Sequence, residues 1–210
     1  MRGSGKTHAM VNFAKEYLDH GSFTRVFIIS PTYDSNPIFH VLNADKGDVY
    51  EDSDHSLKAV EGILKKCKID SDDYDDYHIY MTAYLLWRKK EPLTLEQKTM
   101  LQNNNYDKPP AIPRPSPLLI VDDMSHSDIY STSRHNPFIN LCLRHRHINH
   151  GKGITIFLAC QTFKSGTSFF VGFFQFFATE KVNKSNSALI RTQILHTTIN
   201  ALSRNALNQL

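Results

Sequence analysis

The feature that most constrains the fold is a glycine-rich loop at the start of the chain, followed at once by a helical pattern. Its residues Gly3 to Thr7 match the second half of the pattern G-x-x-x-x-G-K-[ST]. Glycines let backbone N–H groups close around a phosphate, Lys6 can reach the β- and γ-phosphates, and the Thr7 hydroxyl can ligate Mg²⁺. The same letters also occur in ordinary glycine turns that cap a helix.

The loop predicts a nucleotide site with ATP and Mg²⁺ as its cofactors. Apolar residues recur at helical spacing from Met10 to Leu18, so a helix should begin at the loop and point its N-terminal dipole at the phosphates. The expected nucleotide-binding residues are Gly3, Ser4, Gly5, Lys6, Thr7 and His8.

A second motif lies far downstream, where the apolar run Leu118 to Val121 ends in two carboxylates. This is the form of a Walker B strand, in which Asp122 would hold Mg²⁺ and Asp123 would polarise the attacking water. The alternative is that two aspartates only end a strand and begin a turn. The combination of both motifs favours a nucleotide hydrolase.

Short apolar runs also occur at Val26 to Ile29 and Ile154 to Ala159, and helical patterns lie between the runs. This alternation predicts an α/β fold, a P-loop NTPase with a mostly parallel central sheet flanked by helices. Ligands of such sheets lie at the carboxyl ends of the strands, where Gln161 follows the last run. We therefore expect Gln161 to sense the γ-phosphate, close to Lys6 and the two aspartates.

The sequence predicts one domain, residues 1–210, with a helical and proline-rich insertion at 36–117 between the second strand and the Walker B strand. Within it, 56–66, 80–87 and 93–101 have helical spacing, and residues 109–117 contain five prolines and favour a stiff connector. The aspartate-rich run 70–76 is expected to be a solvated loop, and it lacks the glycine and glutamate that a calcium loop requires.

The composition of the chain excludes some classes of protein but does not by itself indicate a function. The formal net charge is only +3, and the three cysteines are widely spaced, which indicates a reducing compartment without disulfides or structural zinc. No apolar stretch is long enough to cross a bilayer, so no membrane partner is expected and the protein should be soluble and intracellular.

A basic stretch precedes the last strand. Its arginines, Arg144 and Arg146, are candidates for an arginine finger supplied to a neighbouring subunit, or for phosphate contacts. We place Arg146 among the catalytic residues with Asp123 and Gln161. The alternative is a solvated basic helix end. The nearby histidines do not have the spacing of a common zinc site.

Taken in order, these motifs resemble the FtsK–HerA-like genome-packaging ATPases of large nucleocytoplasmic DNA viruses, virophages and polinton-type elements. The resemblance is carried by residues 2–7, 118–123, 144–147, 154–165 and 190–193. It implies a homo-oligomeric ring, expected to be a hexamer, that uses ATP to drive double-stranded DNA into a capsid. A capsid or portal-like viral protein would be a further partner, in the host cytoplasm or nucleus where virions assemble.

Two departures from that family bear on activity. The family places a strand and a glycine before the position of Met1, so the chain is expected to be N-terminally truncated. The segment 166–187, which contains the aromatic run 169–177, stands where a short connection is expected. It would be an unspliced intron or a genuine insertion. The alternatives are another ASCE-type P-loop ATPase, such as a helicase or a transposon-associated enzyme, or an inactive fragment of such an enzyme.

Overall fold

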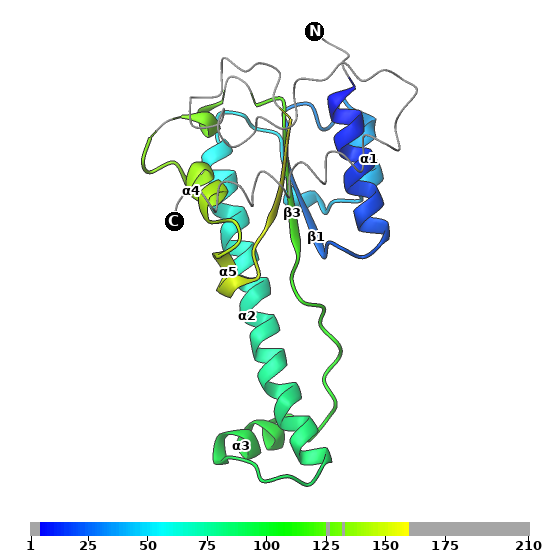
Figure 1. The fold of residues 1–210 in the computed structure, drawn as a ribbon, viewed down its shortest axis with the longest axis vertical. Coiled ribbons are helices and arrows are strands. Elements are labelled where there is room, and N and C mark those ends of the chain that lie inside the picture. The colour runs from blue at the N-terminus through cyan, green and yellow to red at the C-terminus, as the bar shows by residue number, and fades with distance from the viewer. Residues whose placement is uncertain (1–4, 125–126, 132, 160–210) are drawn as a thin grey trace, which may run out of the picture. The chain divides into compact units, whose positions relative to one another are not determined.

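The computed structural model describes residues 5–124, 127–131 and 133–159. The chain divides into two units, 1–165 and 166–210, and every described residue belongs to the first. That unit is an α/β fold with a four-stranded, all-parallel sheet flanked by helices (Figure 1). The general class of fold expected from the sequence is therefore confirmed.

The sheet has the strand order β2-β1-β3-β4, formed by β1 (Arg25–Ile29), β2 (Val49–Tyr50), β3 (Pro117–Asp122) and β4 (Thr155–Ala159). All six residues of β3 are buried, which fits its position between two neighbours and its continuous apolar run. The strands β1 and β3 pair in parallel from Arg25 opposite Pro117 to Ile29 opposite Val121. Among the described residues β4 pairs with β3 alone, and its five residues are partly exposed.

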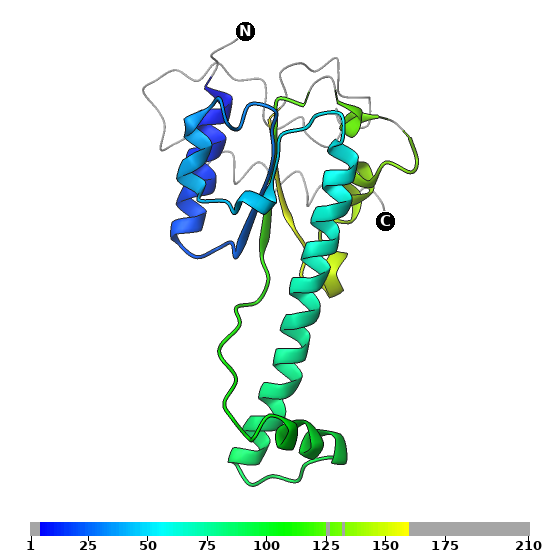
Figure 2. The same ribbon diagram turned by 180° about the vertical axis from the view of Figure 1, so that it is seen from behind.

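Helices cover the two faces of the sheet (Figures 1 and 2). On one face, α1 (Lys6–Asp19) packs with the short 3-10 helix η1 (Pro37–Leu42), and Val11, Ala14 and Phe39 are fully buried there. On the other face lie the start of α2 (Ser56–Arg88) and α4 (Pro137–Arg144). Three short elements complete the unit: η2 (Lys46–Asp48), η3 (Asp128–Tyr130) and α5 (Ile148–Gly151).

The helix α2 corrects part of the sequence prediction. It runs unbroken for 33 residues, so the expected solvated loop at 70–76 is wrong, and the separate helices expected at 56–66 and 80–87 are one helix. The segment 36–117 is also more than an insertion, because it contains strand β2 and because the first half of α2 covers the sheet. The described residues include no helix that is both long and apolar enough to span a membrane.

The second half of α2 projects beyond the sheet and ends at a small helical cap (Figure 1). There α3 (Leu95–Asn103) begins with a capping box, in which Thr94 and Gln97 satisfy each other's backbone N–H groups. Leu101 and Ala83 are fully buried in this cap. Residues 107–116 have no helix or strand and lead back to β3, as the run of prolines predicts.

Two cysteines are described, and both are buried free thiols. Burial raises the pKa of Cys67 and of Cys142 to about 12. Both thiols therefore stay protonated and unreactive at neutral pH, in agreement with a structural role for these two side chains.

An ion-pair network ties β1 to α2. The guanidinium of Arg25 donates to Asp48, at 2.6 and 3.0 Å, and to both carboxylate oxygens of Asp70. Lys66, which lies in α2 like Asp70, donates a hydrogen bond to Asp48 at 2.9 Å. The Asp48 side chain is only 1% exposed. Its burial alone would raise its pKa, but the hydrogen bonds from Arg25 and Lys66 outweigh burial and hold the pKa below its usual value.

We expect Arg25→Met to lower the free energy of unfolding by about 2 kcal/mol, because it leaves a buried carboxylate with one cation. The exposed Lys58→Met, on the outer side of α2, should change it by less than about 0.5 kcal/mol. Urea unfolding measures the free energy of unfolding of both variants.

The stability that the ionised Asp48 contributes through its ion pairs is present above its unfolded pKa of ~3.9. It is lost as the pH falls through the lower pKa that Asp48 has in the folded protein. The free energies of unfolding of the parent and of Arg25→Met should therefore converge in strongly acidic buffer. A difference that stays constant down to that pH would contradict the stabilising ion pair between Arg25 and Asp48.

Candidate functional site

The two sequence motifs meet at the carboxyl edge of the sheet. The Thr7 hydroxyl, in the first turn of α1, donates a 2.8 Å hydrogen bond to the Asp122 carboxylate at the end of β3. These residues are separated by 115 positions in the chain. A contact at this place is what the prediction of a shared nucleotide and metal site requires.

The predicted phosphate loop is described from Gly5 onward. Gly5 is the N-cap of α1 and has φ 71°, a left-handed conformation that favours glycine. Lys6 and His8 follow in the first turn, both exposed, and no acidic residue lies in that turn. An exposed helix N-terminus with a lysine can receive an anion. The predicted ligands Gly3 and Ser4 lie outside the described residues.

Burial controls the electrostatics of Asp122. The residue is 5% exposed, and burial, with the neighbouring charge of Asp123, raises the pKa of its carboxyl. The hydrogen bond from Thr7 and the charge of Lys6 act in the opposite direction. A buried carboxylate that resists ionisation gains from a cation at this position, because the cation replaces the lost hydration.

The backbone at Asp123 is unusual in a way that the sequence did not reveal. Its φ is 56°, so this non-glycine residue is in the left-handed region directly after a buried strand. Aspartate tolerates this region better than most residues, but such conformations still cost free energy and concentrate at functional sites. The conformation turns the chain away from the strand direction at the predicted catalytic carboxylate.

Polar anchors hold the loop that follows Asp123, and sequence reasoning missed them. The buried Asn136, the N-cap of α4, donates through its amide to the carbonyls of Ile129 and Ser131, at 2.9 and 2.8 Å. The Ser127 hydroxyl donates a hydrogen bond to the carbonyl of Ser53, just before α2, and forms a second hydrogen bond with the hydroxyl of Ser56, the first residue of α2. An asparagine before a proline and an apolar helix was a detectable N-cap signal.

Arg146 lies at the other edge of the sheet. The residue before it, His145, accepts a hydrogen bond from the Ile154 backbone just ahead of β4, at 2.9 Å. With strands of five or six residues, this edge is about 16 Å from the Asp122 edge. Arg146 therefore cannot reach Asp122 of its own chain, and its predicted catalytic role would require a neighbouring copy. The predicted sensor Gln161 lies outside the described residues.

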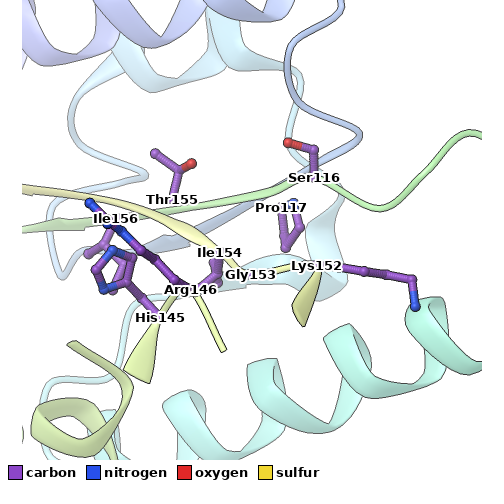
Figure 3. A pocket seen from close by; sticks show the side chains of 9 residues that line it. All are labelled: Ser116, Pro117, His145, Arg146, Lys152, Gly153, Ile154, Thr155 and Ile156. Carbon is purple, nitrogen blue, oxygen red and sulfur yellow. The ribbon is translucent and has the colours of Figure 1, made fainter. Parts of the chain in front are cut away.

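Arg146 instead lines a pocket of about 430 Å³ beside the start of β4 (Figure 3). The Arg146 and His145 side chains lie on one side of it, whereas the Lys152 ammonium points away toward α2. There Lys152 donates to Ser71 and Asp75, at 2.8 and 2.7 Å. One cation of the pocket is thus already engaged within the protein.

Thr7 and Asp122 together fit Mg²⁺ better than a transition metal. Magnesium prefers oxygen ligands, and nucleotide enzymes supply only one or two of them, the rest being phosphate oxygens and water. The described part of the chain contains no group of three or more His, Cys, Asp or Glu residues arranged to hold a metal ion by themselves. A metal at this site would therefore need the nucleotide to complete its coordination.

No protein-family model, curated protein or solved structure matches this chain. What the site can do must therefore come from the chain's own residues and their geometry.

Backbone strain at Asp123 can be measured directly. We expect Asp123→Asn to leave the free energy of unfolding within about 0.5 kcal/mol of the parent, because asparagine also tolerates the left-handed region. Asp123→Val should cost about 1–2 kcal/mol more, because a β-branched side chain does not. Urea unfolding of both variants is the measurement, with Asp123→Gly as the unstrained reference. Equal stability of the asparagine and valine variants would contradict a strained backbone.

Proposed function

We propose that the chain is a Mg²⁺-dependent P-loop nucleoside triphosphatase, with ATP as its substrate. The observation that supports this most strongly is the hydrogen bond between Thr7 and Asp122. It brings the hydroxyl of a G-x-G-K-T loop to the carboxylate that ends an apolar strand, across 115 residues of sequence. The contact lies at the carboxyl edge of the sheet, where ligands of parallel sheets bind.

In the proposed mechanism each residue has one task. Backbone N–H groups at the start of α1 and the Lys6 ammonium bind the phosphates and stabilise the charge that develops during transfer. Thr7 and Asp122 hold Mg²⁺, which when bound neutralises phosphate charge. Asp123 orients the attacking water and accepts its proton, and its left-handed backbone conformation at the end of β3 supports this role.

We further propose that hydrolysis drives double-stranded DNA into a viral capsid, in a ring of identical subunits. The order of the motifs, including the Arg144 to His147 stretch before β4, supports this. The position of Arg146 also supports a ring, because an arginine remote from the nucleotide site of its own subunit is available to the site of a neighbouring subunit. The other candidates are a different ASCE-type ATPase and an inactive fragment.

Substitution of Lys6 is the simplest test of the proposed ATP hydrolysis. We expect Lys6→Ala to lower kcat for ATP hydrolysis at least ~100-fold, since it removes a charge that acts on the transferred phosphoryl group. Lys15→Ala on the same helix is the matched control, and its exposed ion pair with Asp19 contributes little to stability. Phosphate release measures turnover. Equal activity of the two variants would exclude Lys6 from the site.

Duplex DNA tests the motor proposal separately. We expect blunt linear duplexes to stimulate ATP hydrolysis by the parent protein, and the stimulation to fall steeply between about 50 and 200 mM salt as phosphate contacts are lost. Single-stranded DNA of equal length serves as the comparison. Stimulation by single strands alone would favour a helicase, and ATP hydrolysis indifferent to both would remove DNA from the proposal.

A further inference from the structure

The projecting half of α2, with α3 and the connector, forms an arm whose surface chemistry differs from that of the rest of the unit. We define the arm as residues 69–116. It carries six of the nine exposed large hydrophobic side chains among the described residues: Ile69, Ile79, Leu85, Trp87, Leu95 and Ile112. Leu95 is 80% exposed. Apolar side chains gathered on a projecting element indicate a surface that a protein partner covers.

The end of the arm is cationic. Residues 88–114, here called the tip, contain six Lys or Arg and three acidic residues, a surplus equal to the whole formal net charge of the chain. None of these six cations makes an ion pair with another described residue. They are Arg88, Lys89, Lys90, Lys98, Lys108 and Arg114.

The tip also has packing contacts of its own. The Trp87 and Tyr106 rings lie 5.0 Å apart, centroid to centroid, and pack the loop after α3 against α2. The Tyr80 hydroxyl donates to the Asp107 carbonyl at 2.8 Å. A folded cap of this kind presents its surface without the ordering cost of a flexible loop.

The base of the arm carries the opposite charge. The aspartates of residues 70–76 divide by helical position: Asp70 and Asp75 face the body, where they pair with Arg25 and Lys152. Asp73 and Asp76 are exposed and make no ion pair with a described residue.

Asp72 is the third aspartate on the exposed side. Its side chain is 47% exposed, and one of its carboxylate oxygens lies 3.8 Å from the His150 Nε2. Helical spacing places these three aspartates on one face of α2 with the exposed Ile69 and Ile79. We call this face, Ile69, Asp72, Asp73, Asp76 and Ile79, the acidic face.

We propose that the tip of one copy of this chain docks on the acidic face of a second copy. Each surface combines exposed apolar side chains with a surplus of one charge, and the two signs are opposite: among the described residues, six cations without an ion pair in the tip, against Asp73 and Asp76 without one in the acidic face. Duplex DNA would suit the cations of the tip but would leave its apolar side chains, and the acidic face, without a partner. Because the two surfaces lie on different parts of the chain, the contact is heterologous and repeats from copy to copy, which generates a ring or a filament.

Charge exchange in the full chain tests this contact independently of any nucleotide chemistry. Sedimentation velocity over a range of concentrations measures self-association of the parent, of Lys89→Glu with Lys98→Glu in the tip, and of Asp73→Lys with Asp76→Lys in the acidic face. We expect the parent to associate and each double variant to associate about tenfold more weakly, since opposed charges become like charges. The chain that carries all four changes should recover the association of the parent.

The control is Lys46→Glu with Lys58→Glu, which makes the same change of net charge as the tip variant at exposed positions on the body and should associate like the parent. Thermal unfolding by circular dichroism verifies that each variant is folded. A monomeric parent, double variants that associate normally, or a fourfold variant that fails to recover would each overturn the proposal. Loss of duplex DNA binding by the tip variant with unchanged self-association would assign the tip to DNA instead.

Discussion

The hydrogen bond between Thr7 and Asp122 is the contact that holds the two halves of the proposed nucleotide site together. It fixes the start of α1 to the end of β3, and so places a glycine loop, a lysine and two carboxylates at one edge of a parallel sheet. The buried Asp122 would be costly to ionise alone, and burial indeed raises its pKa. Thr7 and Lys6 offset that cost in part, and a divalent cation with a nucleotide would do so more completely.

The site could be predicted from the sequence to the extent that chemistry is local. A glycine in the left-handed region, a lysine, a threonine and an apolar run ending in aspartates are each written in consecutive residues. The parallel sheet then brings them together by a general rule about strand ends. The left-handed backbone at Asp123 and the asparagine that anchors the following loop depend on tertiary packing, and the first of these had no local signal.

The helix α2 shows where sequence reasoning failed. Five aspartates within seven residues were predicted to form a solvated loop, and charge repulsion and weak helix propensity do disfavour a helix there. In the structure, Arg25 and Lys152 from the body neutralise two of them, and the helix continues through the run. Long-range ion pairs therefore override a local preference, and they do so at the point where α2 leaves the sheet and becomes the arm.

The most direct measurement of the central account is a double-mutant cycle on Thr7 and Asp122, read by calorimetry of ATP binding with and without Mg²⁺. If both side chains hold one metal, Thr7→Val and Asp122→Asn should each weaken Mg²⁺-dependent binding, and the double variant should be little worse than either. ATP binding without Mg²⁺ should change far less. Fully additive losses, or Mg²⁺-dependent binding unaffected by either change, would contradict a shared metal site at the edge of this sheet.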